Sequence, residues 1–338
     1  MSAPLRVGVI GLGARCVIAE NCHKATIPAE LVGGCDPNPA MRQRATEVLG
    51  DYPWFETLDE LLELGIDCAI VTSPDDTHED ITCALLEAGV AVYLEKPIAI
   101  TIEGSDRVLE TAYRTKTPLY VGHNMRHMAV VRILRQVVQD GLIGEVRAIW
   151  CRHFVGNGGD YYFKDWHADR SRTTGLLLQK AAHDIDVMNW LSDSVPERVV
   201  GMGDLMLYGK LSDRSGQKSD AVMSDWFSFD NWPPASLTGL NPVIDVEDVS
   251  MLMMRQTSGT LISYEQCHFT PDYWRNYTVI GTEGRAENFG DGEGGVVRVW
   301  KHRSGWEPTG DIEIPIKGDA GGHDDADVAT MDEFLRFV

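Results

Sequence analysis

A carboxylate and an ammonium stand side by side where an apolar run of this chain ends. Residues 90–94 read VAVYL, which is typical of a buried strand, and Glu95, Lys96 and Pro97 follow directly. Pro97 fixes the backbone just after the two charges. A lysine that is buried beside other cations has a lowered pKa and can act as a base towards a hydroxyl group. The pair is therefore expected to face a ligand-binding crevice at the end of this strand. A structural ion pair between Glu95 and Lys96 is the alternative.

The first half of the chain alternates between apolar strands and helices. Strands are expected at 5–13, 30–36, 67–74, 90–97 and 118–124, and helices at 16–25, 40–50, 78–89 and 105–116. Strands that are apolar throughout indicate a parallel sheet covered on both faces, and this pattern predicts a doubly wound α/β domain. Ligands of such sheets bind beyond the carboxyl ends of the strands, where Glu95 and Lys96 lie. Five other residues share that edge, namely Thr72, Ser73, Pro74, His123 and Asn124.

Two glycines mark the turn from the first strand into the first helix. Gly11 and Gly13 leave room there for a phosphate to approach the backbone and the helix N-terminus. Cys16 stands where a third glycine is usual, so the GxGxxG match is incomplete. Asp36 ends the second strand, where an acid accepts hydrogen bonds from the ribose hydroxyls of NAD and repels the 2′-phosphate of NADP. An ordinary turn and a helix-capping acid are the alternatives for these residues.

Six segments together resemble one enzyme family. They are GLGAR at 11–15, VTSPDDTH at 71–78, EKPIAIT at 95–101, GHNMR at 122–126, GLLLQKAAHDIDVMNWL at 175–191 and YTVIGTEGRAEN at 277–288. In these the chain is similar, from residue 5 to its end, to the Gfo/Idh/MocA oxidoreductases. The resemblance implies an NAD(P)-dependent enzyme that acts mainly on sugars, polyols or inositols.

The resemblance also implies which residues form the cofactor site. Lys96 is expected to contact both the nicotinamide ribose and the substrate hydroxyl. The other expected cofactor contacts are Gly11, Gly13, Ala14, Arg15, Asp36, Thr72, Ser73, Pro74, His78, Glu95, Pro97 and Asn124. NAD is expected because of Asp36, and Asn38 and Arg42 close to it leave NADP as a less favoured alternative.

The segment 175–191 is expected to form one helix, because it is rich in leucine, alanine, glutamine and lysine. By the resemblance, His183 is its catalytic histidine. Many family members carry an aspartate four residues earlier, and this chain has Gln179, which can orient an imidazole but cannot stabilise its charged form. We therefore predict a catalytic set of Lys96, His183 and Lys180. Asp184 and Asp186 in the same segment are weaker candidates for the site, and a place on the helix surface is the alternative for them.

The pattern changes after the first domain, which we predict to be residues 1–122. Strands are expected at 145–155, 247–269, 276–288 and 296–300, with a hairpin turn at Ser258 and Gly259. They predict an α+β domain at 123–338 with an open, largely antiparallel sheet, one face of which covers the His183 helix. The resemblance implies that the other face forms a homodimer or homotetramer.

Several polar segments join these strands. Tyr162, Trp166, His167, Arg170 and Arg172 are candidates for a sugar site, since aromatic rings pack on the apolar faces of sugars, and a surface loop is the alternative. Arg126 and Gln179 are further candidate substrate contacts. Residues 204–242 are expected to be a polar, mobile insertion. His323, Asp324, Asp325 and Asp327 are expected to cap a helix and not to bind a metal, and by the resemblance the C-terminus is short.

Composition narrows the class of protein. The formal net charge of -21 argues against a nucleic-acid partner, because a polyanion would be repelled. Neither a run of about eighteen apolar residues nor a secretory signal is present, so no membrane association is expected. The 7 scattered cysteines have no ligand spacing and indicate a reducing, cytoplasmic compartment. Two other functions stay open, an NAD-dependent glycosidase-like hydrolase and a non-catalytic NAD-binding regulatory protein.

Overall fold

The first sheet of the structure is parallel and has the strand order β3-β2-β1-β4-β5-β6. The computed structural model describes residues 3–218, 220–318 and 324–338. The strands are β1 Leu5–Ile10, β2 Ala29–Cys35, β3 Trp54–Phe55, β4 Cys68–Val71, β5 Ala91–Leu94 and β6 Leu119–Val121. The order reverses between β1 and β4, which is the arrangement of a doubly wound nucleotide-binding sheet. The predicted α/β class is confirmed. The strand β3 was not predicted, because two residues carry no periodicity.

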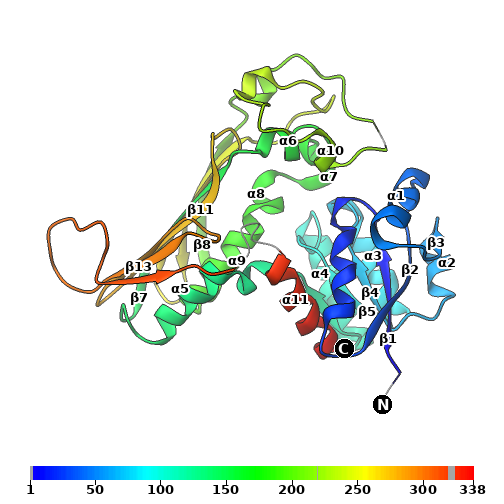
Figure 1. Ribbon diagram of the computed structural model, residues 1–338, viewed down its shortest axis with the longest axis horizontal. Coiled ribbons are helices and arrows are strands. Elements are labelled where there is room, and N and C mark those ends of the chain that lie inside the picture. Colours follow the sequence, from blue (N-terminus) through cyan, green and yellow to red (C-terminus); the bar gives the residue numbers. More distant parts are fainter. Residues whose placement is uncertain (1–2, 219, 319–323) are drawn as a thin grey trace.

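Helices cover both faces of this sheet (Figure 1). They are η1 Ala14–Lys24, α1 Pro39–Leu49, α2 Leu58–Leu62, η2 Asp75–Thr77, α3 His78–Glu87 and α4 Ile102–Thr115. Polar side chains begin several of them. The Asn38 side chain accepts a hydrogen bond from the amide of Ala40 at the start of α1, and Thr101 accepts one from Gly104 at the start of α4. The helix predicted at 16–25 is a 3-10 helix, η1.

The second sheet has eight strands in the order β14-β13-β12-β11-β7-β10-β9-β8. They are β7 Val146–Val155, β8 Pro196–Asp204, β9 Val249–Gln256, β10 Leu261–Cys267, β11 Tyr273–Gly281, β12 Arg285–Phe289, β13 Val296–Trp300 and β14 Ile312–Pro315. Among the described strands of this sheet, only β7 and β10 pair in parallel, so the largely antiparallel sheet is confirmed. The predicted hairpin joins β9 to β10, and Gly259 in its turn has a φ of 86°, which favours glycine.

Two helices bury one face of the second sheet. These are α5 Ala129–Gln139 and α9 Ala181–Ser192, which carries His183. Leu134 of α5 and Met188 of α9 join one hydrophobic cluster with Ile149 and Tyr264 of the sheet, all of them buried. The prediction that the sheet packs on the His183 helix is confirmed.

The prediction of one continuous helix at 175–191 is wrong in one respect, because the helix is broken at Lys180. It consists of α8 Leu176–Gln179 and α9, and Lys180 between them has a φ of -105°. In a continuous helix the carbonyl of Gln179 would accept the amide of His183. Here that carbonyl accepts a hydrogen bond from the side chain of Lys96, at 2.9 Å. The break therefore lies where the two halves of the molecule meet.

The segment 204–242 is packed, in contrast to the polar insertion that we expected. It forms η5 Tyr208–Lys210, α10 Met223–Trp226 and η6 Pro234–Ser236. Tyr208 is fully buried and stacks on Phe163 with ring centroids 4.2 Å apart, and Leu237 and Leu240 complete this cluster. Hydrophobic residues spaced irregularly between polar ones gave no period from which this core could be predicted.

The last helix returns to the first sheet. The helix α11 Asp324–Phe337 lies beside η1 at the N-terminal end of the chain (Figure 1). Phe334 is buried and packs against Tyr93 and Tyr120, with centroids 5.7 and 5.9 Å apart. The predicted division between residues 122 and 123 stays a prediction. His323 lies outside the described residues.

Candidate active site

The two glycines of the first turn differ in what surrounds them. Gly11 has a φ of 87°, and a Cβ atom there would lie 2.4 Å from the amide nitrogen of Ser73. A Cβ atom on Gly13 would meet nothing within 4 Å. Gly11 is therefore required by the fold, whereas Gly13 leaves its backbone open at the N-terminus of η1. An open backbone at a helix N-terminus is what a phosphate group needs.

Asp36 is bonded to this same turn. Its carboxylate accepts hydrogen bonds from the amides of Leu12 and Asn38, both at 2.8 Å. Arg42 donates to the backbone carbonyl of Asp36 at 2.6 Å and lies 3.9 Å from Glu56. The acid is thus fixed beside the glycine turn at the carboxyl end of β2, as the sequence led us to expect, and Arg42 is already engaged.

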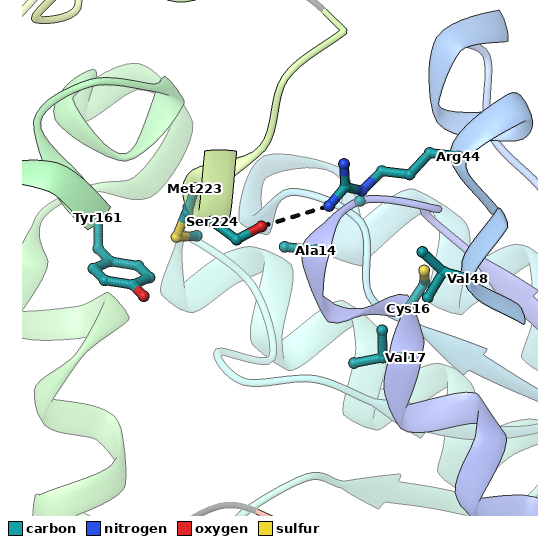
Figure 2. A pocket seen from close by; sticks show the side chains of 9 residues that line it. Ala14, Cys16, Val17, Arg44, Val48, Tyr161, Met223 and Ser224 are labelled. Atoms are coloured by element: carbon teal, nitrogen blue, oxygen red, sulfur yellow. Dashed lines mark hydrogen bonds between the residues drawn. The ribbon is translucent and has the colours of Figure 1, made fainter. Parts of the chain in front are cut away.

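A cavity of about 220 Å³ opens beside the turn, and the sequence did not predict its far wall (Figure 2). Arg44 of α1 donates to the hydroxyl of Ser224 at 3.5 Å and lies 3.4 Å from Asp225, both residues of α10. Cys16 is buried, and burial raises the pKa of its thiol to about 11. The cavity is lined by Gly13, Ala14, Cys16, Val17, Arg44, Val48, Tyr161, Met223 and Ser224. The inserted segment therefore reaches the predicted cofactor site.

Side chains at the ends of β4 and β5 fix the neighbouring backbone. The hydroxyl of Thr72 donates to the carbonyl of Gly11 at 2.7 Å, and Thr77 bonds the hydroxyl of Ser73 at 2.7 Å, next to Pro74. The buried ring of His78 contacts the carbonyls of Ser73 at 2.9 Å and Pro97 at 2.7 Å. His78 therefore joins the ends of the two strands.

Lys96 is the central cation of the site. Its peptide bond to Pro97 is cis, and its ammonium donates to the carbonyl of Gln179. Burial lowers the pKa of Lys96 to about 8, and Asp75 and Glu95 oppose that shift. Near neutral pH, the amine can then exist in both protonation states.

Asp75 was not singled out by the sequence, although it lies within the segment 71–78. It is buried, and its carboxylate accepts a hydrogen bond from Thr173 at 3.2 Å. Burial raises the pKa of Asp75, against the opposing charges of Lys96, His78 and His167. Asp75 therefore adds a carboxylate to the neighbourhood of Lys96, whereas position 179 carries a neutral amide.

Three predicted cofactor contacts are linked through Asp327 of α11, and they are Arg15, Glu95 and Asn124. The guanidinium of Arg15 donates to Glu95 at 2.7 Å and to Asp327 at 2.5 and 2.8 Å. The amide of Asn124 donates to Asp327 at 2.8 Å. The carboxylate of Asp327 therefore joins η1 to the end of β6, and the helix-capping role predicted for this residue stays a prediction.

The helix break sets Gln179, Lys180 and His183 at the junction of the two halves. All three are buried. The Gln179 side-chain oxygen has no hydrogen-bond partner among the described residues, so it is available to a ligand. Burial by itself lowers the pKa of Lys180, but the phenol oxygens of Tyr162 and Tyr273 leave that pKa raised. The pKa of Lys180 is therefore shifted in the opposite direction from that of Lys96.

The candidate sugar contacts divide into two groups. The ammonium of Lys180 lies 5.5 Å from the ring centre of Tyr162, which packs against His167, and Trp166 stacks on His167 at 3.7 Å. These rings are therefore brought to Lys180.

The three arginine candidates, by contrast, form ion pairs with acidic residues. Arg126 forms a two-bond ion pair with Asp186 at 2.7 and 2.5 Å, Arg170 bonds Glu247 and Arg172 bonds Asp76.

Asp184 is not on the helix surface, and that alternative is wrong for it. It is fully buried and lies 3.2 Å from Arg275. His153, Tyr264 and Tyr277 also bond its carboxylate. Burial would raise the pKa of Asp184, but Arg275 and His153 hold it well below its usual range. The residue after His183 is thus anchored in the second sheet.

Two other classes of site find no support in the described part of the chain. No group of three or more histidine, cysteine, aspartate or glutamate side chains among these residues could hold a metal ion. No helix among them is long and apolar enough to span a membrane. The open backbone at Gly13, the adjoining cavity and the unpaired oxygen of Gln179 all fit a dinucleotide with a polar substrate beside it.

Known proteins share both the sequence and the fold. The chain is 26% identical over 299 residues to YteT of Bacillus subtilis strain 168, an oxidoreductase by name, which covers 77% of this chain and 70% of YteT. It is 30% identical over 197 residues to an inositol 2-dehydrogenase of Serratia proteamaculans strain 568, which covers 56% and 55% of the two chains. The chain thus spans about half the length of this second relative.

Solved structures have the same fold. A levoglucosan dehydrogenase in complex with NADH and levoglucosan superposes with a TM-score of 0.77 at 18% identity, covering 98% of this chain and 89% of that one. The apo scyllo-inositol dehydrogenase of Lactobacillus casei gives 0.72 at 20% identity, covering 98% and 87%.

Two family profiles match most of the chain. Residues 5–123 match the oxidoreductase family with an NAD-binding Rossmann fold, and residues 131–287 match the GFO/IDH/MocA C-terminal domain. The protein therefore belongs to the GFO/IDH/MocA oxidoreductase family and carries its NAD-binding Rossmann domain.

Proposed function

We propose that this protein transfers a hydride between NAD(H) and a hydroxyl-bearing carbon of a sugar, polyol or inositol. The observation that carries the proposal is Lys96, an amine with a pKa of about 8 that donates to the carbonyl of Gln179, just before the helix with His183. We assign residues 1–122 to the cofactor and residues 123–338 to the substrate and assembly. The dehydrogenase names of the relatives support the substrate class.

The proposed chemistry needs a base for the hydroxyl proton. When bound, NAD⁺ accepts the hydride. Lys96 in its neutral form takes the proton from the hydroxyl as the carbonyl forms, and in the reverse direction the ammonium returns it. Lys180 stays cationic and stabilises negative charge that develops on the substrate oxygen. His183 and the oxygen of Gln179 orient the substrate, and Tyr162, Trp166 and His167 pack on it.

The substrate class can be tested by NADH or NADPH formation at 340 nm with NAD⁺ or NADP⁺, respectively, and a panel of inositols, aldoses and sugar acids. NADH formation with one of these substrates supports the proposal, and a preference for NAD⁺ supports the role of Asp36. Hydrolysis of a glycoside without net NADH would favour the hydrolase. NAD binding with neither reaction would favour the regulatory protein.

Replacing Gly13 by valine is expected to abolish tight cofactor binding without unfolding the protein. The added side chain enters open space, and the φ of -73° at this position suits any residue. Its methyl groups would occupy the place of the pyrophosphate, so we expect the Kd for NAD to rise about a hundredfold, or roughly 3 kcal/mol. Fluorescence titration and thermal denaturation measure the two effects.

The control for Gly13→Val is Gly11→Ala, which should lower the stability of the fold. Its methyl group would meet the backbone of Ser73, so the melting temperature should fall. Equal NAD affinity in wild type and Gly13→Val would remove the turn from the proposed cofactor site.

The outer face of the second sheet supports a homodimer or homotetramer. Met202 of β8 pairs with Met251 of β9, and all three methionines at positions 202, 251 and 253 are exposed. Large apolar patches are uncommon on monomers. We expect light scattering to give a dimer or tetramer, and Met253→Glu to shift it towards the monomer. Phe229→Glu, at another exposed apolar residue, should not change the mass.

We also infer a cytoplasmic location, since all 7 cysteines are free.

A further inference from the structure

The carboxylate of Asp327 is the meeting point of three segments that are far apart in the sequence. It bonds both terminal nitrogens of Arg15, at the start of η1, and the amide of Asn124, at the start of η3 Asn124–His127. The third nitrogen of Arg15 bonds Glu95 at the end of β5. Asp327 itself belongs to α11, 312 residues along the chain from Arg15. One side chain of the last helix thus fixes three residues around the proposed cofactor site.

These groups are buried, so their arrangement has a strong effect on the energy of the site. Asp327, Glu95 and Asn124 are each less than 10% exposed, at 6%, 7% and 1%. Two carboxylates and one guanidinium leave one net negative charge in this buried cluster. Bidentate bonds between a guanidinium and a carboxylate fix orientation as well as charge. Without Asp327, Arg15 would keep only its bond to Glu95 among these contacts.

We propose that Asp327 is a positioning residue of the cofactor site, so that docking of α11 and binding of NAD are thermodynamically coupled. The inference rests on the proposed cofactor role of Arg15, Glu95 and Asn124. NAD would bind best to the arrangement that the docked helix holds, because a preorganised site loses less freedom on binding. By reciprocity, bound NAD would stabilise the docked helix to the same extent.

The same helix supplies a matched control. Asp332 of α11 accepts hydrogen bonds from the amide and the hydroxyl of Thr26, both at 2.6 Å. It therefore attaches α11 to the segment after η1, with the same kind of side chain. Thr26 is not among the proposed cofactor contacts. Asp327→Asn and Asp332→Asn remove the same charge from one helix, and only the first change reaches Arg15 and Asn124.

The test combines NAD titration with hydrogen exchange of the α11 amides, using the full chain. We expect Asp327→Asn to weaken NAD binding about tenfold, within the usual range of coupling between sites. Asp332→Asn and the charge-retaining Asp327→Glu should stay within about threefold of wild type. NAD should slow exchange in α11 of wild type and Asp332→Asn, and this protection should be lost in Asp327→Asn.

Two results would overturn the coupling. One is equal weakening by both asparagine variants, which would mean that Asp327 only stabilises the helix. The other is wild-type NAD affinity in Asp327→Asn together with unchanged protection of α11. If wild type itself bound no NAD, the proposed function would fail first, and that is visible without any variant. If Asp327→Asn failed to fold, Arg15→Met would take its place, because it removes the same two bonds from the other side, and unchanged NAD affinity together with unchanged protection of α11 in Arg15→Met would overturn the coupling.

Discussion

Lys96→Met is expected to lower kcat of the proposed dehydrogenase about a thousandfold, while the protein still binds NAD. A positioned general base or acid typically contributes a factor of this order. The methionine keeps the length of the side chain and its packing, and loses both the positive charge and the ability to exchange a proton. Steady-state kinetics at 340 nm measure the loss, and titration with NAD checks that the cofactor site survives.

Lys96→Arg separates the two properties of the lysine. The guanidinium keeps the positive charge, but it cannot lose its proton at any accessible pH. If Lys96 acts as the base, Lys96→Arg should be as inactive as Lys96→Met. Substantial turnover in Lys96→Arg would mean that only the charge matters, and a base would then have to be sought among His183 and other residues.

The pH dependence of wild type follows from the lowered pKa of Lys96, which is about 8. Oxidation needs the neutral amine, so kcat/KM should rise as the pH passes through about 8 and level off above it. Reduction needs the ammonium, so its kcat/KM should fall over the same range. Both limbs should be absent from Lys96→Met.

The lowered pKa of Lys96 also makes the stability of the fold depend on pH. The folded-state pKa of Lys96 lies below its usual value of 10.5, so burial of the ammonium disfavours the folded state below about pH 8. This unfavourable contribution is removed as the pH rises from about 8 to 10.5. Lys96→Met should therefore be at least as stable as wild type at pH 7, even though it is inactive.

Much of the first domain could be predicted, because its signals are local. A parallel strand buried on both faces is apolar throughout, and Gly11 and Asp36 sit where one strand passes into a turn. Lys96 could be found for the same reason, since a charged pair after VAVYL contrasts with its surroundings. The helix at 175–191 was predicted as an element, but its break depends on a hydrogen bond from Lys96, 83 residues away.

Two parts of the site could not be predicted, because tertiary contacts alone define them. Asp327 looks like one of several acids at a helix start, and only the return of α11 to η1 brings it to Arg15. Ser224 lies in a segment without periodicity, and tertiary contacts such as the hydrogen bond from the Trp226 indole to the carbonyl of Asp160 place α10 beside the glycine turn. Residue type and spacing do not indicate contacts between segments so far apart in the sequence.

Arg275→Met is expected to lower the free energy of unfolding by about 3 to 5 kcal/mol, the usual effect of removing one partner of a buried ion pair. Arg275 is 1% exposed and Asp184 is fully buried, and they lie 3.2 Å apart. Without the guanidinium, the carboxylate would keep only its bonds to His153, Tyr264 and Tyr277 in a region of low polarity. Urea denaturation at pH 7 measures the loss.

The pH dependence of this variant should be opposite to that of wild type. In wild type the lowered pKa of Asp184 stabilises the fold above the unfolded-state pKa, and that contribution is lost only as the pH falls through the folded-state value. In Arg275→Met burial would raise the pKa of Asp184, so protonation at mild acid pH would relieve part of the damage. The difference in stability from wild type should therefore shrink between pH 7 and pH 5.

The double variant Arg275→Met with Asp184→Asn supplies the control. It leaves no buried charge at this position, so it should recover a large part of the stability that Arg275→Met loses. Equal loss in the single and double variants would mean that Arg275 acts by its packing volume and not by its charge. Because Asp184 follows His183 in the first turn of α9, the same pair also anchors the proposed catalytic histidine. We therefore expect kcat to fall in folded Arg275→Met and to recover, at least in part, in the double variant.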